Sequence, residues 1–154
     1  LGDEAIAVFG RAQRFLDASK SGVYRVTDAG IPREAAREAG LAVLDIPVDG
    51  VADKDMLLQR LATSLAFPDW FGGNWDALED CLGDLSWHEA PGYVLLLHEA
   101  GALAQRCPDD YGVLIDVLGE SAQYWRERKR PFFAVAVDPD RQLALPVLYN
   151  ELAR

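Results

Sequence analysis

The sequence has only two cysteines, has no long hydrophobic run, and lacks Lys and Arg altogether between residues 61 and 105. Cys81 and Cys107 have no zinc-type spacing and are too few for a disulfide framework, so they indicate a reducing compartment. We therefore expect a cytoplasmic protein. The longest apolar runs have about five residues, whereas a helix that spans a bilayer needs roughly 20. The sequence predicts no membrane span.

In other respects the composition is that of an ordinary globular protein. Of the 154 residues, 50% are hydrophobic and 26% are charged. A chain of this length buries roughly 70% of its unfolded surface, so one apolar core is sufficient without disulfide or metal cross-links. We expect residues 1–154 to form a single domain with no cofactor and no metal.

The negative charge is concentrated in the middle of the chain. The formal net charge is −10, and residues 61–105 contribute −7 of it through seven carboxylates. Such a charge repels nucleic acid and anionic membrane surfaces, so neither is an expected partner. Three of the four tryptophans, Trp70, Trp75 and Trp87, lie in the same stretch, and tryptophan is enriched at protein interfaces. Acidic and aromatic side chains therefore coincide in sequence.

Four short apolar runs predict β-strands. They lie at residues 23–26, 41–46, 93–98 and 132–137, and the last two are apolar enough for strands that are covered on both faces. Residues 143–149 are interpreted as a short edge strand despite Pro146.

Helical patterns separate these runs. We expect a first helix over residues 1–18, interrupted at Gly10, a second from Pro32, a third capped by Asp53, and a long one from about Tyr111 to Lys129. The connections are too long for hairpins, so right-handed crossovers should give an α/β fold with a small, mainly parallel sheet packed by helices. The cations at 126–130 lie where the dipole of the long helix favours them, which indicates a structural role.

The acidic stretch contains a further predicted helix. Residues 67–74 are rich in turn-forming and aromatic residues, and Asn74 is a suitable N-cap for a helix from Trp75 to about Leu85. At about 100° per residue, the carboxylates fall on one side of this helix and the leucines and Cys81 on the other. We expect the apolar side to pack on the sheet. The other side then forms an exposed acidic stripe made of Asp76, Glu79, Asp80 and Asp84.

This stripe has two interpretations. Charged helix faces are common and often serve only to keep a protein in solution. However, Asp76 and Asp80 repel each other at a four-residue spacing, at a cost of about 0.2–0.5 kcal/mol, so stability alone does not select the arrangement. Carboxylates without cations among them attract basic surfaces and can displace phosphate from a cationic site. The second interpretation is therefore a docking surface for a basic partner.

Residues 67–82, which read FPDWFGGNWDALEDCL, resemble the motif of the barstar family, intracellular inhibitors of barnase-type ribonucleases. The shared elements are a Pro, an aromatic pair, a Gly, and then Asn-x-Asp-Ala-Leu-x-Asp-Cys-Leu with unbroken spacing. The order of the predicted elements over about residues 41–137 also resembles the family. The helix and strand within residues 1–40 would then be an N-terminal extension of a barstar-like fold.

The resemblance implies one protein partner, a basic ribonuclease, whose active site this loop and helix block in a one-to-one complex. By position, Asp80 would enter the phosphate-binding pocket of the nuclease and Asp76 would engage its basic residues. At the two variable positions of the motif, this chain differs from the inhibitor that gives the family its name, because Glu79 replaces a Trp and Trp75 replaces a Leu. A Glu that the family uses late on its last helix would correspond to Glu127. The loop and the stripe together give the expected partner-binding set: Trp70, Phe71, Gly72, Asn74, Trp75, Asp76, Glu79, Asp80 and Asp84.

Other functions remain open to different degrees. Paired carboxylates can act as acid and base or hold Mg²⁺, but an exposed stripe offers neither a pocket nor separated pKa values, and no Gly-rich phosphate loop or Ser/His/Asp pattern accompanies it. We therefore do not expect an enzyme.

The histidines and Cys81 are not expected to carry chemistry. His88 and His98 lack metal-type spacing, and Cys81 is expected to be a buried, inert thiol. An immunity or interaction protein of the same fold, directed at a different basic toxin, would present the same surface and is not distinguished by sequence.

Overall fold

The computed structural model describes residues 3–149, and the chain alternates helices and strands throughout this range. In chain order the elements are α1 (Asp3–Leu16), the 3-10 helix η1 (Ala18–Lys20), β1 (Gly22–Val26), α2 (Gly30–Glu38), β2 (Ala42–Pro47), α3 (Lys54–Ser64), α4 (Trp75–Leu82), the 3-10 helix η2 (Ser86–His88), β3 (Tyr93–His98), α5 (Ala100–Arg106), α6 (Pro108–Glu127) and β4 (Phe132–Val137). All four predicted internal strands are present, shifted by one residue at most at each end.

The four strands form one parallel sheet in the order β1-β4-β3-β2. The two most apolar runs, β3 and β4, occupy its centre, where five of the six residues of each are buried. This is the position predicted for them, because a central parallel strand is covered on both faces. The predicted α/β class, with a small parallel sheet packed by helices, is confirmed.

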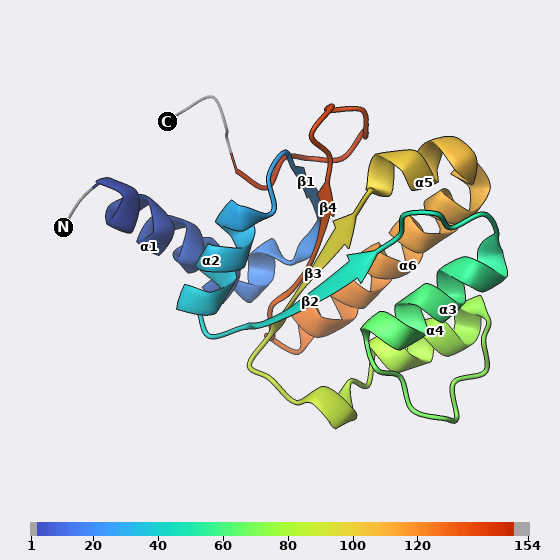
Figure 1. The fold of residues 1–154 in the computed structure, drawn as a ribbon. Coiled ribbons are helices and arrows are strands. Elements are labelled where there is room, and N and C mark those ends of the chain that lie inside the picture. Colours follow the sequence, from blue (N-terminus) through green and yellow to red (C-terminus); the bar gives the residue numbers. More distant parts are fainter. Residues whose placement is uncertain (1–2, 150–154) are drawn as a thin grey trace.

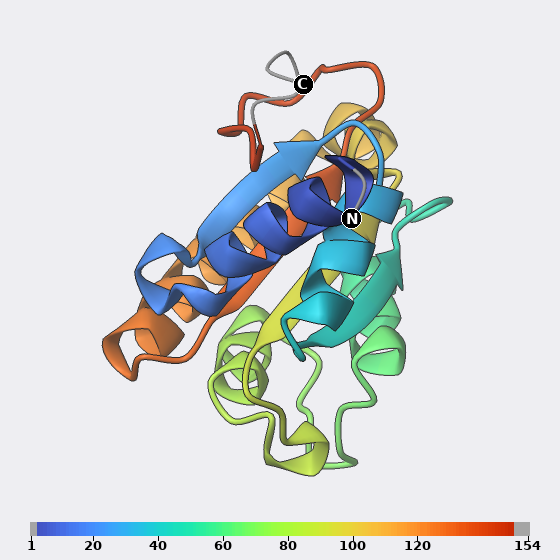
Figure 2. The ribbon, with the colours of Figure 1, turned by 90° about the vertical axis from the view of Figure 1, so that its left-hand side faces the viewer.

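Helices cover the two faces of the sheet unequally. Figures 1 and 2 show α1 and α2 on one face and the other four α-helices on the opposite face. Successive strand residues point to opposite faces, so Val94 and Leu96 pack with Phe15 of α1, whereas Leu95 and Leu97 pack with the core that includes α3, α4 and α6. The N-terminal α1 and α2 therefore bury a sheet face that would otherwise be apolar and exposed.

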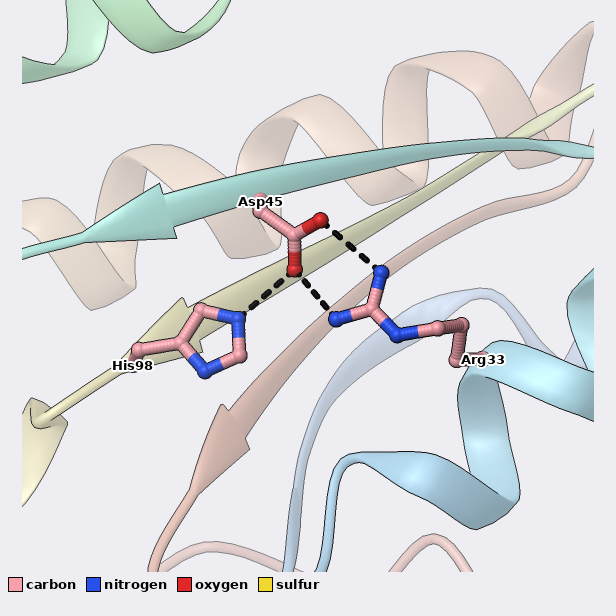
Figure 3. A network of polar contacts seen from close by, with 3 residues as sticks. All are labelled: Arg33, Asp45 and His98. Atoms are coloured by element: carbon pink, nitrogen blue, oxygen red, sulfur yellow. Dashed lines mark hydrogen bonds and ion pairs between the residues drawn. The ribbon is translucent and has the colours of Figure 1, made fainter.

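A small polar network joins α2 to the sheet (Figure 3). The Arg33 guanidinium donates two hydrogen bonds to the Asp45 carboxylate of β2, at 2.6 and 2.8 Å, and His98 Nε2 at the end of β3 lies 2.7 Å from the same carboxylate. The Arg33 hydrogen bond is the main reason why the pKa of Asp45 falls to about 2. This network fastens the N-terminal part of the chain to the strands that follow it.

The helices differ from the sequence prediction in several places, and α2 starts at Gly30 rather than at Pro32. The first helix is continuous through Gly10, because a single glycine costs a helix only about 1 kcal/mol and does not break it. α5 was not predicted, and α6 starts at Pro108 rather than near Tyr111. Cys107 ends one helix and precedes the next, since proline disfavours helical geometry in the residue before it and is itself favourable in the first turn. Residues 1 and 2 of the predicted first helix lie outside the described range.

The segment at 143–149 was predicted as an edge strand, and this prediction is wrong. It makes one isolated bridge to β1, between Arg25 and Val147, flanked by hydrogen bonds from Arg25 N to Pro146 O and from Leu148 N to Arg25 O. Pro146 has no N–H group to donate, so pairing does not extend into a ladder.

Across residues 3–149, no helix is both long enough and apolar enough to cross a membrane.

Candidate protein-docking surface

The predicted acidic helix is present as α4 and begins at the predicted residue. Asn74 is its N-cap, and the side-chain oxygen of Asn74 accepts a hydrogen bond from the Ala77 backbone N–H at 2.7 Å. Gly73 adopts a φ of +70°, a left-handed conformation that glycine takes without strain. α4 ends at Leu82, three residues earlier than predicted, because Leu85 turns the chain with a φ of +51°.

We call Asp76, Glu79, Asp80 and Asp84 the acidic face. All four residues are exposed, with Asp84 lying just beyond the helix. The ion pairs between described side chains are Arg33–Asp45, Arg60–Asp49 and His98–Asp45, and none of them involves the acidic face. Asp76 and Asp80 are therefore turned outward, and no cation of the described chain neutralises them.

The apolar side of α4 is buried, as predicted, but it packs chiefly against α6 rather than on the sheet. Trp125 of α6 donates a hydrogen bond from its indole N–H to the Leu82 carbonyl at 2.8 Å, which satisfies an acceptor at the end of α4. Burial raises the pKa of the Cys81 thiol to about 11, assisted by the charges of Asp84 and Asp80. Cys81 is thus a buried, weakly acidic thiol, in agreement with the sequence prediction.

We call residues 67–74 the aromatic loop. Trp70 is its most exposed large side chain, at 58%, whereas Phe71 and the adjoining Trp75 are half-buried and Gly72 is exposed. The Trp70 ring meets the Trp87 ring edge-on, with centroids 6.0 Å apart. Trp87 in turn donates its indole N–H to the Leu65 carbonyl at 3.1 Å. Trp87 therefore anchors the loop, and Trp70 projects from that anchor.

A carboxylate of α6, Glu120, lies beside α4. A cavity of about 270 Å³ lies between α4 and α6, lined by Glu79, Asp80, Gly83, Glu120, Ser121 and Tyr124. Glu120 thus lies beside α4. Glu127, the residue expected from the resemblance, is seven residues further along α6 and accepts a hydrogen bond from Gln123 at 3.3 Å. A role for Glu127 at the docking surface stays a prediction, and the position of Glu120 beside α4 was not predicted from sequence, because the contact between α4 and α6 was not foreseen.

The two glutamates across this cavity affect one another. The pKa of Glu79 is raised, first by desolvation and then by the hydrogen bond and the negative charge of Glu120. Two carboxylates in contact favour a shared proton or a bound cation. The cavity therefore has the chemistry of an acceptor for a positively charged group.

The basic cluster at the end of α6 is used within the chain, as expected. Arg126 donates to the Ser21 carbonyl at 2.9 Å, and Arg130 donates to the Ala90 carbonyl. Arg128 stacks on the Tyr124 ring, with its guanidinium carbon 3.5 Å from the centroid. These cations hold the backbone and shape the wall of the cavity rather than neutralising the acidic face.

Comparison with known proteins gives a family assignment. The family model for barstar, the barnase inhibitor, matches residues 41–137. The chain belongs to the barstar family. The matched range coincides with the barstar-like region expected from sequence, and it contains the whole aromatic loop, α4 and α6. A search of curated proteins found no match.

Among solved structures, the Aeropyrum pernix ORC2 protein, determined as ADPNP-ADP complexes, is similar to this chain with a TM-score of 0.54 and 17% sequence identity. The match covers 86% of this chain but only 39% of that protein. A likeness at this level of identity concerns the fold alone.

Proposed function

We propose that this member of the barstar family inhibits a basic ribonuclease, of the barnase type or related to it, by covering the nuclease active site with the acidic face and the aromatic loop. The observation that carries the proposal is that Asp76 and Asp80 are exposed and form no ion pair with a described residue, on a helix within the family region. The proposed complex contains one copy of each protein. Two free, buried cysteines fit the cytoplasmic location that we expect for such an inhibitor.

The acidic face resembles an RNA backbone in the property that a ribonuclease recognises. Ionised carboxylates accept hydrogen bonds without donating any, as phosphate oxygens do, and Arg and Lys bind both groups. Asp76 and Asp80 lie one helical turn apart, so both can face the same cationic cleft. A negative surface without interspersed cations also accelerates the encounter with a basic protein.

Charge alone does not hold a complex together, and the aromatic loop supplies the apolar contact. Exposed tryptophans in the centre of an interface contribute much of the binding energy of protein complexes. Trp70 is exposed, yet its ring is supported by Trp87, so little conformational entropy is lost when it docks. We assign Trp70 the role of the main apolar anchor.

The cavity between α4 and α6 supplies a second place for a cation of the partner. Glu79, Asp80 and Glu120 line it, and an Arg or Lys side chain that enters it would relieve the repulsion that raises the pKa of Glu79. Because Glu79 occupies a position where the inhibitor that gives the family its name has Trp, this part of the surface is more acidic than in that inhibitor. A target with an additional cation facing α4 fits it best.

An immunity or interaction protein directed at a different basic toxin is the alternative, and the additional carboxylate of Glu79 is the observation that favours it. The two functions differ in whether ribonuclease activity is inhibited. A titration of a barnase-type ribonuclease with the purified chain should reach full inhibition at a one-to-one ratio, with association that slows as salt is added.

A double variant, Asp76→Asn with Asp80→Asn, should lose this inhibition. The matched control, Glu34→Gln with Glu38→Gln, removes two exposed carboxylates of α2 on the opposite face of the sheet and should retain it. Full inhibition by the first double variant would contradict the proposal. If the natural chain binds a basic protein that is not a ribonuclease, and no ribonuclease is inhibited, the alternative is correct.

A further inference from the structure

A cavity of about 240 Å³ opens at the carboxyl end of β1, away from the proposed docking surface. Its lining comes from α1, the turn after β1, the start of α2 and the chain after β4, and includes Arg11, Asp28, Ile31, Pro32, Arg141 and Tyr149. None of these residues lies in the family region 41–137. In Figure 1 these segments lie in the upper left part of the molecule, whereas the aromatic loop and η2 lie at the bottom.

The topology of the sheet favours a ligand at this place. The crossover that leaves β1 carries α2 over one face of the sheet, whereas the connections from β2 to β3 and from β3 to β4 cross the opposite face (Figures 1 and 2). β1 and β4 are neighbours in the sheet, but the helix that follows β1 and the helices that precede β4 lie on opposite faces. The side on which the connections run therefore changes between these two adjacent strands. In open α/β sheets, a crevice for ligands forms outside the carboxyl ends of the strands at such a reversal.

The lining of this cavity is cationic in a protein with a net charge of −10. Among the described residues, it contains two arginines, Arg11 and Arg141, and one carboxylate, Asp28. The Arg11 guanidinium lies over the Tyr149 ring, 5.5 Å from the centroid, and no ion pair joins Arg11 to a described carboxylate. Within residues 3–149, Arg11 therefore has no ion-pair partner.

Arg14, one turn further along α1, strengthens this observation. Its side-chain Nε is buried and has no acceptor within residues 3–149. Burial raises the pKa of Tyr149 above its usual range, and the charges of Arg11 and Arg14 both act against that rise. The Arg14 guanidinium itself lies over the Tyr24 ring, 5.2 Å from the centroid. Buried donors normally have an acceptor, and a bound anion would supply negative charge to this group of cations.

We propose that this cavity binds a small molecule through its phosphate or carboxylate group. Arg11 holds the oxyanion, because the planar guanidinium matches both groups with paired hydrogen bonds, and Arg141 lines the same cavity. Ile31 and Tyr149 provide an apolar wall for the remainder of the molecule. The volume of about 240 Å³ is below the usual range of about 300–1,000 Å³ for ligand sites, which limits the ligand to a small metabolite. The bound oxyanion lies between α1 and the chain that follows β4.

The test is a titration of the ¹⁵N-labelled full chain with sodium phosphate and, separately, with sodium acetate, using sodium chloride at the same ionic strength as the reference. We expect saturable amide shifts at residues 26–31, on the floor of the cavity. Saturation by phosphate assigns a phosphate ligand, and saturation by acetate alone assigns a carboxylate. Shifts with neither anion beyond those with chloride would overturn the proposal.

Two variants separate a built site from general attraction to positive charge. Arg11→Gln removes a cation that lines the cavity and should weaken binding about tenfold or more. Arg37→Gln removes an exposed cation near the end of α2, outside the lining, and should leave the affinity unchanged. Equal loss in both variants would refute the site, and each variant's own amide spectrum shows whether it folds. Because the lining lies outside the family region, either result leaves the ribonuclease proposal unaffected.

Discussion

The N-cap residue of α4, Asn74, connects the fold to the proposed function. The structure identifies the hydrogen bond that is lost when Asn74 is replaced, so the loss of stability can be estimated. Asn74→Ala removes the acceptor of the 2.7 Å hydrogen bond from Ala77 N–H. Loss of an N-cap costs typically about 1 kcal/mol, within a range of about 0.5–2 kcal/mol. α4 has only eight residues, so its first turn, which presents Trp75 and Asp76, depends strongly on this bond.

The chain contains a matched control in α3. Asp53 caps α3 by accepting a hydrogen bond from Met56 N–H at 2.9 Å, and it lies outside the proposed docking surface. Urea unfolding should show that Asn74→Ala and Asp53→Ala each lower the free energy of unfolding by about 1 kcal/mol. Only Asn74→Ala should weaken ribonuclease inhibition, by up to about fivefold if the complex must restore the lost cap energy.

A third variant separates the cap from direct contact. Asn74→Ser keeps a capping oxygen but loses the amide group, so stability should return to within a few tenths of a kcal/mol of the natural chain. If inhibition also returns, the cap acts by holding α4 in place. If Asn74→Ala loses stability and inhibits as well as the natural chain, α4 does not have to be ordered for binding, and the reasoning is refuted.

Three further predictions concern single carboxylates. Asp80→Ala should weaken ribonuclease inhibition about tenfold or more, because it leaves cations of the partner without an acceptor, whereas Glu38→Ala should have no effect in the same titration. Glu79 has a raised pKa and must be ionised to bind a cation, so inhibition by the natural chain should weaken as the pH falls toward that pKa, and Glu79→Gln should flatten this dependence. Asp45 has a pKa lowered to about 2, so the stability it adds is present above about pH 4 and is lost as the pH falls toward 2. Because its side chain is 44% exposed, the gap in urea midpoint between the natural chain and Asp45→Asn should correspond to less than about 1 kcal/mol and should close over that pH range.

The strands and the acidic helix could be predicted from sequence because each depends on local information. Apolar runs of five or six residues identify β3 and β4 and their central position, since only buried strands are apolar on both faces. Asn74 marks the start of α4, and the helical period separates its carboxylates from its leucines. The position of Asn74 and the exposure of the acidic face therefore agree with the sequence prediction.

The features that were missed have both tertiary and local causes. The sequence shows that α4 has an apolar side, but not that this side packs on α6, so the position of Glu120 beside α4 was not predicted. α5 is short, and its seven residues carry too little periodicity to separate it from the loop before α6. The segment at 143–149 has the alternation of a strand, but Pro146 allows it only one bridge to β1. A tertiary contact thus decides the first case, whereas a weak helical pattern and a proline within the segment itself decide the other two.

The most direct test of the proposed function is a hydrogen-exchange footprint of the full chain in complex with a barnase-type ribonuclease. We expect slower amide exchange at residues 70–82 and in α6 around Glu120, with no change in α2 or at the carboxyl end of β1. Protection that appears on α2 and is absent from residues 70–82 would show that the ribonuclease binds elsewhere, and would contradict the assignment of the acidic face and the aromatic loop as the inhibitory surface.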